Sequence, residues 1–132
     1  MNIFLTHAFF KSYKKYDLNE VPNKYNTIVH ASESPFESLT ERCNWLGYQI
    51  VNDESGFGKL LLHKGVCEKE IKEWMKDIQY VSLPPDGSES GSIFNYLKGY
   101  DANECIDRIV SICDVELGIV RDDSIGCSCS IM

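Results

Sequence analysis

The sequence predicts an α+β fold, in which four to five helices pack on a small, mostly antiparallel sheet in a single compact domain. Its 132 residues are a common size for one domain and are enough to bury one continuous core. Apolar residues recur at helical spacing in several segments, and β-branched segments lie between turn signals. We assign residues 1–120 to the domain and residues 121–132 to a flexible C-terminal tail.

Two amphipathic helices are predicted in the N-terminal part of the chain. Apolar residues repeat every three or four positions over residues 3–16, with lysines on the other side. A proline-containing loop and a short strand at residues 27–30 should follow. Ser34-Pro35-Phe36-Glu37 is a capping-box pattern with proline at the first helical position, so a second helix should begin there. Gly47 should end it in the left-handed conformation.

The middle of the chain is predicted to form a hairpin, a helix and a strand. Residues 48–52 and 57–63 flank the turn-rich tetrapeptide Asp53-Glu54-Ser55-Gly56, which is a hairpin signal. Residues 66–78 alternate apolar and charged side chains at helical period, with Glu68 and Lys72 spaced to attract each other. A strand over residues 79–83 should end at the two prolines that follow it.

The C-terminal part is predicted to contain a mobile loop, two helices and a last strand. Residues 84–92 are rich in proline, glycine and serine, which favours a loop or hinge. Residues 93–97 should form a short helix. Asp101 is placed to cap a longer helix whose apolar stripe includes Cys105 and Ile109. Residues 115–120 are predicted to form the last strand.

The charge of the chain is strongly negative after its first thirty residues. The formal net charge is −7, from 13 basic and 20 acidic residues. Nucleic-acid affinity comes largely from basic groups that displace counterions, so direct nucleic-acid binding is not expected. The same surface would attract a basic macromolecule and speed its encounter with this chain.

No catalytic, metal or cofactor motif is predicted. His7, His30 and His63 lie in no known nucleophile or metal context. The stretch Gly56-Phe57-Gly58-Lys59 lacks the glycine spacing of a phosphate loop and the hydroxyl residue after the lysine. Cys127 and Cys129 lack the second ligand pair that a zinc site needs. We therefore expect a protein that is not an enzyme and carries no metal or cofactor.

The cysteines and the last four residues of the sequence bear on the cellular compartment of the protein. Cys43, Cys105 and Cys113 fall on apolar helix faces, which favours reduced thiols and a cytoplasmic protein. No apolar run approaches the ~20 residues that span a bilayer. Cys129-Ser130-Ile131-Met132 matches a prenylation pattern, but no basic segment precedes it. A lipid-anchored regulator and a small cytosolic enzyme therefore remain the alternatives to a binding protein.

In size, acidity, predicted α+β architecture and absence of catalytic groups, the chain resembles the small cytosolic immunity proteins that protect bacteria from polymorphic toxins, including those of contact-dependent growth inhibition. The resemblance implies that the chain binds a basic toxin domain, such as a nuclease, and occludes its active site. Acidic residues and tyrosine anchors are the expected contacts: Asp53, Glu54, Glu68, Glu70, Glu73, Asp77, Asp86, Glu89, Tyr80, Tyr96 and Tyr100.

Overall fold

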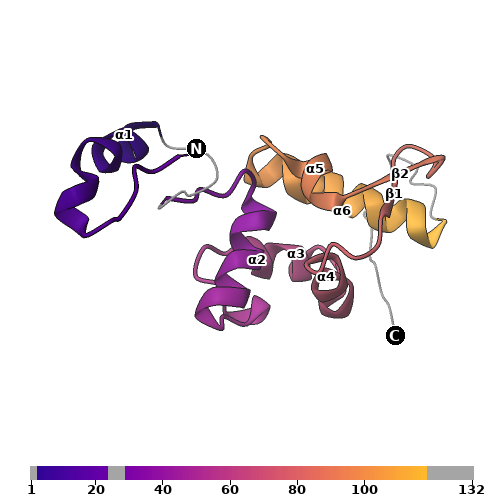
Figure 1. The fold of residues 1–132 in the computed structure, drawn as a ribbon. Coiled ribbons are helices and arrows are strands. Elements are labelled where there is room, and N and C mark those ends of the chain that lie inside the picture. The colour runs from indigo at the N-terminus through magenta and orange to yellow at the C-terminus, as the bar shows by residue number, and fades with distance from the viewer. Residues whose placement is uncertain (1–2, 24–28, 119–132) are drawn as a thin grey trace. The chain divides into compact units, whose positions relative to one another are not determined.

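The computed structural model describes residues 3–23 and 29–118 (Figure 1), and the chain divides into two compact units, residues 1–33 and residues 34–132. The predicted single domain over residues 1–120 spans both units and stays a prediction. The predicted tail at residues 121–132 lies outside the described residues. Among the described helices, none is long and apolar enough to cross a membrane.

The first unit contains the predicted N-terminal helix. Helix α1 spans Ile3–Ser12 and continues as the 3-10 helix η1 over Tyr13–Tyr16. Asp17 ends it with a positive φ of 54°, a conformation that aspartate adopts more readily than most residues. The predicted strand is absent at residues 29 and 30, and its first two residues lie outside the described part of the chain.

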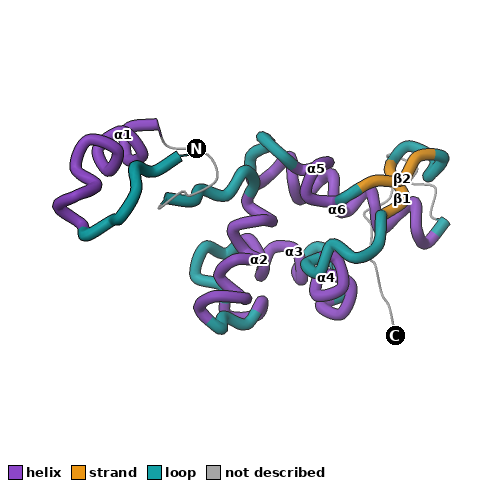
Figure 2. Tube along the Cα trace, viewed as in Figure 1, coloured by secondary structure: helices purple, strands orange, loops and turns teal. Residues whose placement is uncertain are grey.

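The second unit is a helical body with one small antiparallel hairpin, which makes the fold α+β. Figure 2 shows that the strands of the described chain are confined to this hairpin. The elements in chain order are α2 (Pro35–Leu46), the 3-10 helix η2 (Ile50–Asn52), α3 (Phe57–His63), α4 (Glu68–Trp74), β1 (Val81–Leu83), β2 (Glu89–Gly91), α5 (Ile93–Leu97) and α6 (Ala102–Leu117).

The two predicted helix starts are confirmed, together with their capping side chains. The Ser34 hydroxyl accepts the backbone N–H of Glu37 at 3.1 Å, and Gly47 ends α2 in the left-handed conformation. At the start of α6, Asp101 accepts the N–H of Glu104 while the Glu104 carboxylate accepts the N–H of Asp101. Each cap satisfies backbone donors that the first helical turn leaves without partners.

The predicted hairpin over residues 48–63 is wrong. The structure has η2 and α3 there, with Gly56 between them at a positive φ of 79°. The carboxylate of Asp53 accepts the N–H of Gly58 in the first turn of α3. Phe57 and Leu61 are buried on the inner face of this helix. Tertiary burial of this helix face therefore decides the conformation against the turn signal.

The predicted strand at residues 115–120 is also wrong where the structure describes it. Helix α6 continues to Leu117, and Gly118 ends it in the left-handed conformation, with its N–H donating to the carbonyl of Val115. The end of this helix packs closely against the hairpin. A Cβ atom added to Gly87 would lie 2.7 Å from Cγ1 of Val115.

The segment predicted to be a mobile loop, residues 84–92, contains strand β2. It pairs antiparallel with β1, so that Val81 lies opposite Gly91 and Leu83 lies opposite Glu89. Within the turn, the Asp86 carboxylate accepts the N–H of Ser88 at 3.0 Å. Pairing with β1, whose first residue Val81 is buried, gives order to a serine- and glycine-rich strand of low intrinsic propensity.

The core of the second unit is built by all five of its α-helices, with α6 in contact with β1, α2 and α3. Its fully buried aliphatic and aromatic side chains are Phe36, Leu39, Ile50, Leu61, Ile71, Ile93, Leu97, Ile109 and Ile112. The described cysteines are free thiols, as predicted: Cys43, Cys67, Cys105 and Cys113.

Candidate partner-binding pocket

A surface pocket of about 270 Å³ lies where the end of α4, the segment leading into β1, and the last turn of α6 meet. We call it the α4–β1 pocket. Two of the predicted contact residues, Glu73 and Tyr80, are brought together in it. Its lining includes Glu73, Trp74, Ile78, Tyr80, Val81 and Glu116.

The chain reversal after α4 exposes the apolar side chains of the pocket. Trp74 is buried against the core, but Asp77 then adopts a positive φ of 49° and turns the backbone outward. Ile78 and Tyr80 consequently stay 78% and 72% exposed. Val81 returns the chain to the interior as the first residue of β1. Two large apolar side chains in water beside a pocket are typical of a binding surface.

Carboxylates accompany these apolar groups. Glu73 forms an ion pair with Lys76, with 2.7 Å between oxygen and nitrogen. Both side chains are more than half exposed, so this pair contributes at most about 1 kcal/mol and can be exchanged for another partner. Glu116, in the last turn of α6, also lines the pocket.

A second carboxylate lies close to Glu116. Partial loss of water raises the pKa of Glu116 above its usual value, a hydrogen bond from the backbone of Ser82 opposes that shift, and the carboxylate of Glu70 adds to it. The Oε2 atom of Glu70 is buried and accepts no hydrogen bond from the described residues. The carboxylates of Glu70 on α4 and Glu116 at the end of α6 thus lie near each other.

The other predicted residues of α4 and its end lie outside the pocket lining. Glu68 pairs with Lys72 at 2.8 Å, which confirms the predicted attraction between them. Asp77 is exposed at the turn that shapes the pocket. Asp77 adds to the negative field around the pocket without lining it, whereas Lys72 balances the charge of Glu68.

The predicted residues of the hairpin, of α5 and of the loop after α5 lie at separate places. Asp86 and Glu89 are exposed on the β1–β2 hairpin, and hydrogen bonds from Ser88 lower the pKa of the Asp86 carboxyl. Tyr96 and Tyr100 both face Arg108, whose guanidinium carbon lies 4.7 Å and 3.7 Å from their ring centroids. Their rings are thus already engaged by a cation of this chain.

Asp53 was predicted to be a surface contact, and the structure corrects this. Its side chain is fully buried and forms an ion pair with Arg42. Burial by itself raises the pKa of Asp53, but hydrogen bonds from Gly58, Ser55 and Arg42 outweigh that effect and hold the pKa below its usual value. Glu54, its neighbour, is exposed. Asp53 therefore organises the fold and is not available to a partner.

Sequence reasoning missed Ile78 and Glu116 as members of the pocket. Glu116 was assigned to a strand, although the apolar stripe of α6 and the glycine at position 118 together predict that the helix continues to Leu117. Ile78 is the last residue of the helix predicted over residues 66–78, and the structure places it after the end of α4. No local signal in the sequence shows that the chain turns at Asp77, one residue before Ile78.

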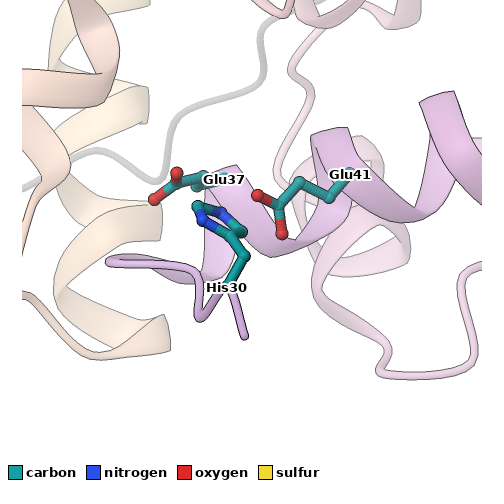
Figure 3. A group of neighbouring side chains, drawn as sticks. All are labelled: His30, Glu37 and Glu41. Atoms are coloured by element: carbon teal, nitrogen blue, oxygen red, sulfur yellow. The ribbon is translucent and has the colours of Figure 1, made fainter. Parts of the chain in front are cut away.

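A pair of acidic residues on α2 is a further arrangement of ligand-type side chains in the described part of the chain. Glu37 and Glu41 lie one turn apart on this helix (Figure 3). Hard cations such as Ca²⁺ take about six to eight oxygen ligands, so two carboxylates alone do not form a metal site. His30, drawn with them, belongs to the first unit. The prenylation pattern at residues 129–132 lies outside the described residues.

No protein-family model matches this chain, and neither the curated proteins nor the solved structures include a significant match to it.

Proposed function

We propose that this chain is a non-catalytic immunity protein that binds a basic toxin domain and occludes its active site. The observation that carries the proposal is the α4–β1 pocket, in which exposed Ile78 and Tyr80 lie beside the carboxylates of Glu73 and Glu116. Protein interfaces commonly combine a desolvated aromatic or aliphatic anchor with a charged rim.

The charge of the whole chain supports the same function. Nuclease domains are basic because they hold phosphate groups, so an acidic protein is drawn toward their substrate clefts. The net charge of −7 provides this attraction at a distance, and it acts over roughly a Debye length of about 8 Å at physiological salt. Glu54, Asp77, Asp86 and Glu89 are also exposed and add acidic groups to the surface of the second unit outside the pocket.

Occlusion is a purely steric mechanism, which suits a small cytoplasmic protein. The protein acts in the cytoplasm, where its toxin would act, and it needs no cofactor, no direct nucleic-acid contact and no membrane. Occlusion requires only that the complex dissociate more slowly than the toxin encounters its substrate. Affinity then depends mainly on the dissociation rate, which a desolvated anchor such as Tyr80 slows.

Calorimetry with the product of the neighbouring gene tests the proposal. We expect a complex of nanomolar affinity whose association constant falls as salt rises, together with loss of the toxin's enzymatic activity on mixing. A neighbouring product that shows no binding at low salt, or that binds without losing activity, would contradict the proposed function. Heat-unfolded protein, which lacks the pocket but keeps the charge, is the control for non-specific attraction.

A further inference from the structure

We infer that the α4–β1 pocket receives one arginine side chain of the partner protein, an inference that rests on the proposed function and specifies its central contact. The size of the pocket is the first reason. Its volume of about 270 Å³ is at the lower edge of the ~300–1,000 Å³ of sites that enclose a drug-sized molecule. A single long side chain suits this volume better than a whole small-molecule ligand.

The carboxylates that line the pocket favour a cation. Glu73 and Glu116 line it, and the carboxylate of Glu70 lies close enough to Glu116 to affect its ionisation. Among the described residues that line the pocket, none is a lysine or an arginine. Lys76 reaches Glu73 through an exposed ion pair. An incoming cation can replace this lysine at little cost, because exposed pairs are weak.

The aromatic side chain favours arginine over lysine. Tyr80 is 72% exposed, so much of its ring is open to a partner. A planar guanidinium can stack on an aromatic ring and donate two parallel hydrogen bonds to a carboxylate, whereas an ammonium is a point charge that can do neither as well. The same chain already uses this contact internally, since the guanidinium of Arg108 lies 3.7 Å from the ring centroid of Tyr100.

A second copy of this chain is a poor occupant. Two molecules that each carry a net charge of −7 repel each other at the distances over which they approach. A basic protein that carries an arginine on a convex surface is complementary to the pocket in both charge and shape. Exposed Ile78 would then pack against apolar atoms beside that arginine.

The test is an amide chemical-shift titration of the full chain with the peptide acetyl-Gly-Arg-Gly-amide at low salt. Matched peptides carry lysine or the uncharged isostere citrulline in place of arginine. We expect the arginine peptide to shift the amides of residues 73–82 and 113–118. The lysine peptide should bind more weakly, and the citrulline peptide should leave these amides unshifted.

Three variants make the test specific. Glu116→Gln should weaken binding of the arginine peptide about tenfold, because it removes a charge-assisted hydrogen bond. Tyr80→Ala should weaken binding about threefold through loss of the stacking contact. Trp45→Ser is the matched control, since Trp45 is an 83% exposed aromatic residue on α2, outside the pocket, and its loss should leave the affinity unchanged.

The inference is overturned if the arginine peptide causes no shifts, if the shifts spread evenly over the acidic surface, or if the citrulline peptide produces the same shifts. It is also overturned if Glu116→Gln and Tyr80→Ala both bind the peptide as the unaltered protein does. Failure of the proposed function is a different result, namely the absence of a complex between the unaltered protein and its basic partner. A tight complex that both variants preserve would retain the function and reject the arginine contact.

Discussion

Arg42 donates two hydrogen bonds to one carboxylate oxygen of the fully buried Asp53, from Nε at 3.1 Å and from Nη2 at 2.8 Å. The other oxygen accepts the hydroxyl of Ser55 at 2.6 Å and the N–H of Gly58 at 2.9 Å. The pair therefore ties α2 to the start of α3. Removing one partner would leave the other charge buried and unpaired, and this costs far more free energy than keeping the pair.

Replacing Asp53 by asparagine should destabilise the fold. The variant removes the charge that compensates Arg42 and one of the two acceptor oxygens, so either Arg42 or the Ser55 and Gly58 donors lose their acceptor. We expect the free energy of unfolding to fall by about 3 kcal/mol, near the lower end of the range for breaking a buried pair, because Arg42 keeps some contact with water. Urea denaturation followed by circular dichroism measures this change. The matched variant Glu54→Gln should unfold at the urea concentration of the unaltered protein.

The contribution of Asp53 should depend on pH. Its pKa in the folded protein is lower than in the unfolded chain, where it is about 3.9. The stabilisation is therefore complete above that value and is lost as the pH falls through the folded pKa. The difference in unfolding free energy between the unaltered protein and Asp53→Asn should shrink below about pH 4. A urea series over pH tests this, and a difference that stays constant would contradict it.

Gly58 should resist replacement even by alanine. A Cβ atom there would lie 2.9 Å from the carbonyl oxygen of Ile50 and 3.1 Å from its Cγ2. Alanine gains up to about 1 kcal/mol of helix propensity over glycine, but overpacking typically costs about 1–3 kcal/mol. We expect Gly58→Ala to lower the melting temperature. Lys59→Ala, at the next and exposed position of α3, should leave it nearly unchanged.

Cys105 should react much more slowly than Cys67. Its side chain is fully buried and its thiol lies 3.6 Å from the carbonyl oxygen of Tyr100. Burial, with a further contribution from Asp101, raises the pKa of Cys105 to about 11. Because the thiolate is the reactive form, alkylation by iodoacetamide at neutral pH should be about a hundredfold slower than at an ordinary thiol. Peptide mass spectrometry over time measures both rates, and equal labelling of Cys67 and Cys105 would refute this.

The parts of the fold that the sequence predicts correctly are those whose signals are local. Ser34 and Asp101 cap helices through residues three positions away, so the pattern contains both partners. The failed hairpin prediction has the opposite cause. Asp53 finds its counterion in Arg42, 11 residues earlier, and no short window that covers a turn signal includes that partner.

The residues of the candidate site also fall into those that a local signal predicts and those that it does not. Glu73 and Tyr80 could be named from the sequence because they flank the end of a predictable helix. Glu116 joins them only because α6 packs against β1 and the hairpin turn lies on Val115. Strand β2 was not predicted for a related reason. Its serine and glycine residues are ordered by pairing with β1 rather than by their own strand propensity.

The most direct test of the account is hydrogen exchange of the complex with the basic partner, compared with exchange of the free protein. We predict slower exchange over residues 73–82 and 113–118, and no change at the exposed end of α2 around Trp45. Slower exchange confined to α2, or the same exchange in the presence and absence of the partner, would contradict the claim that the α4–β1 pocket is the binding surface.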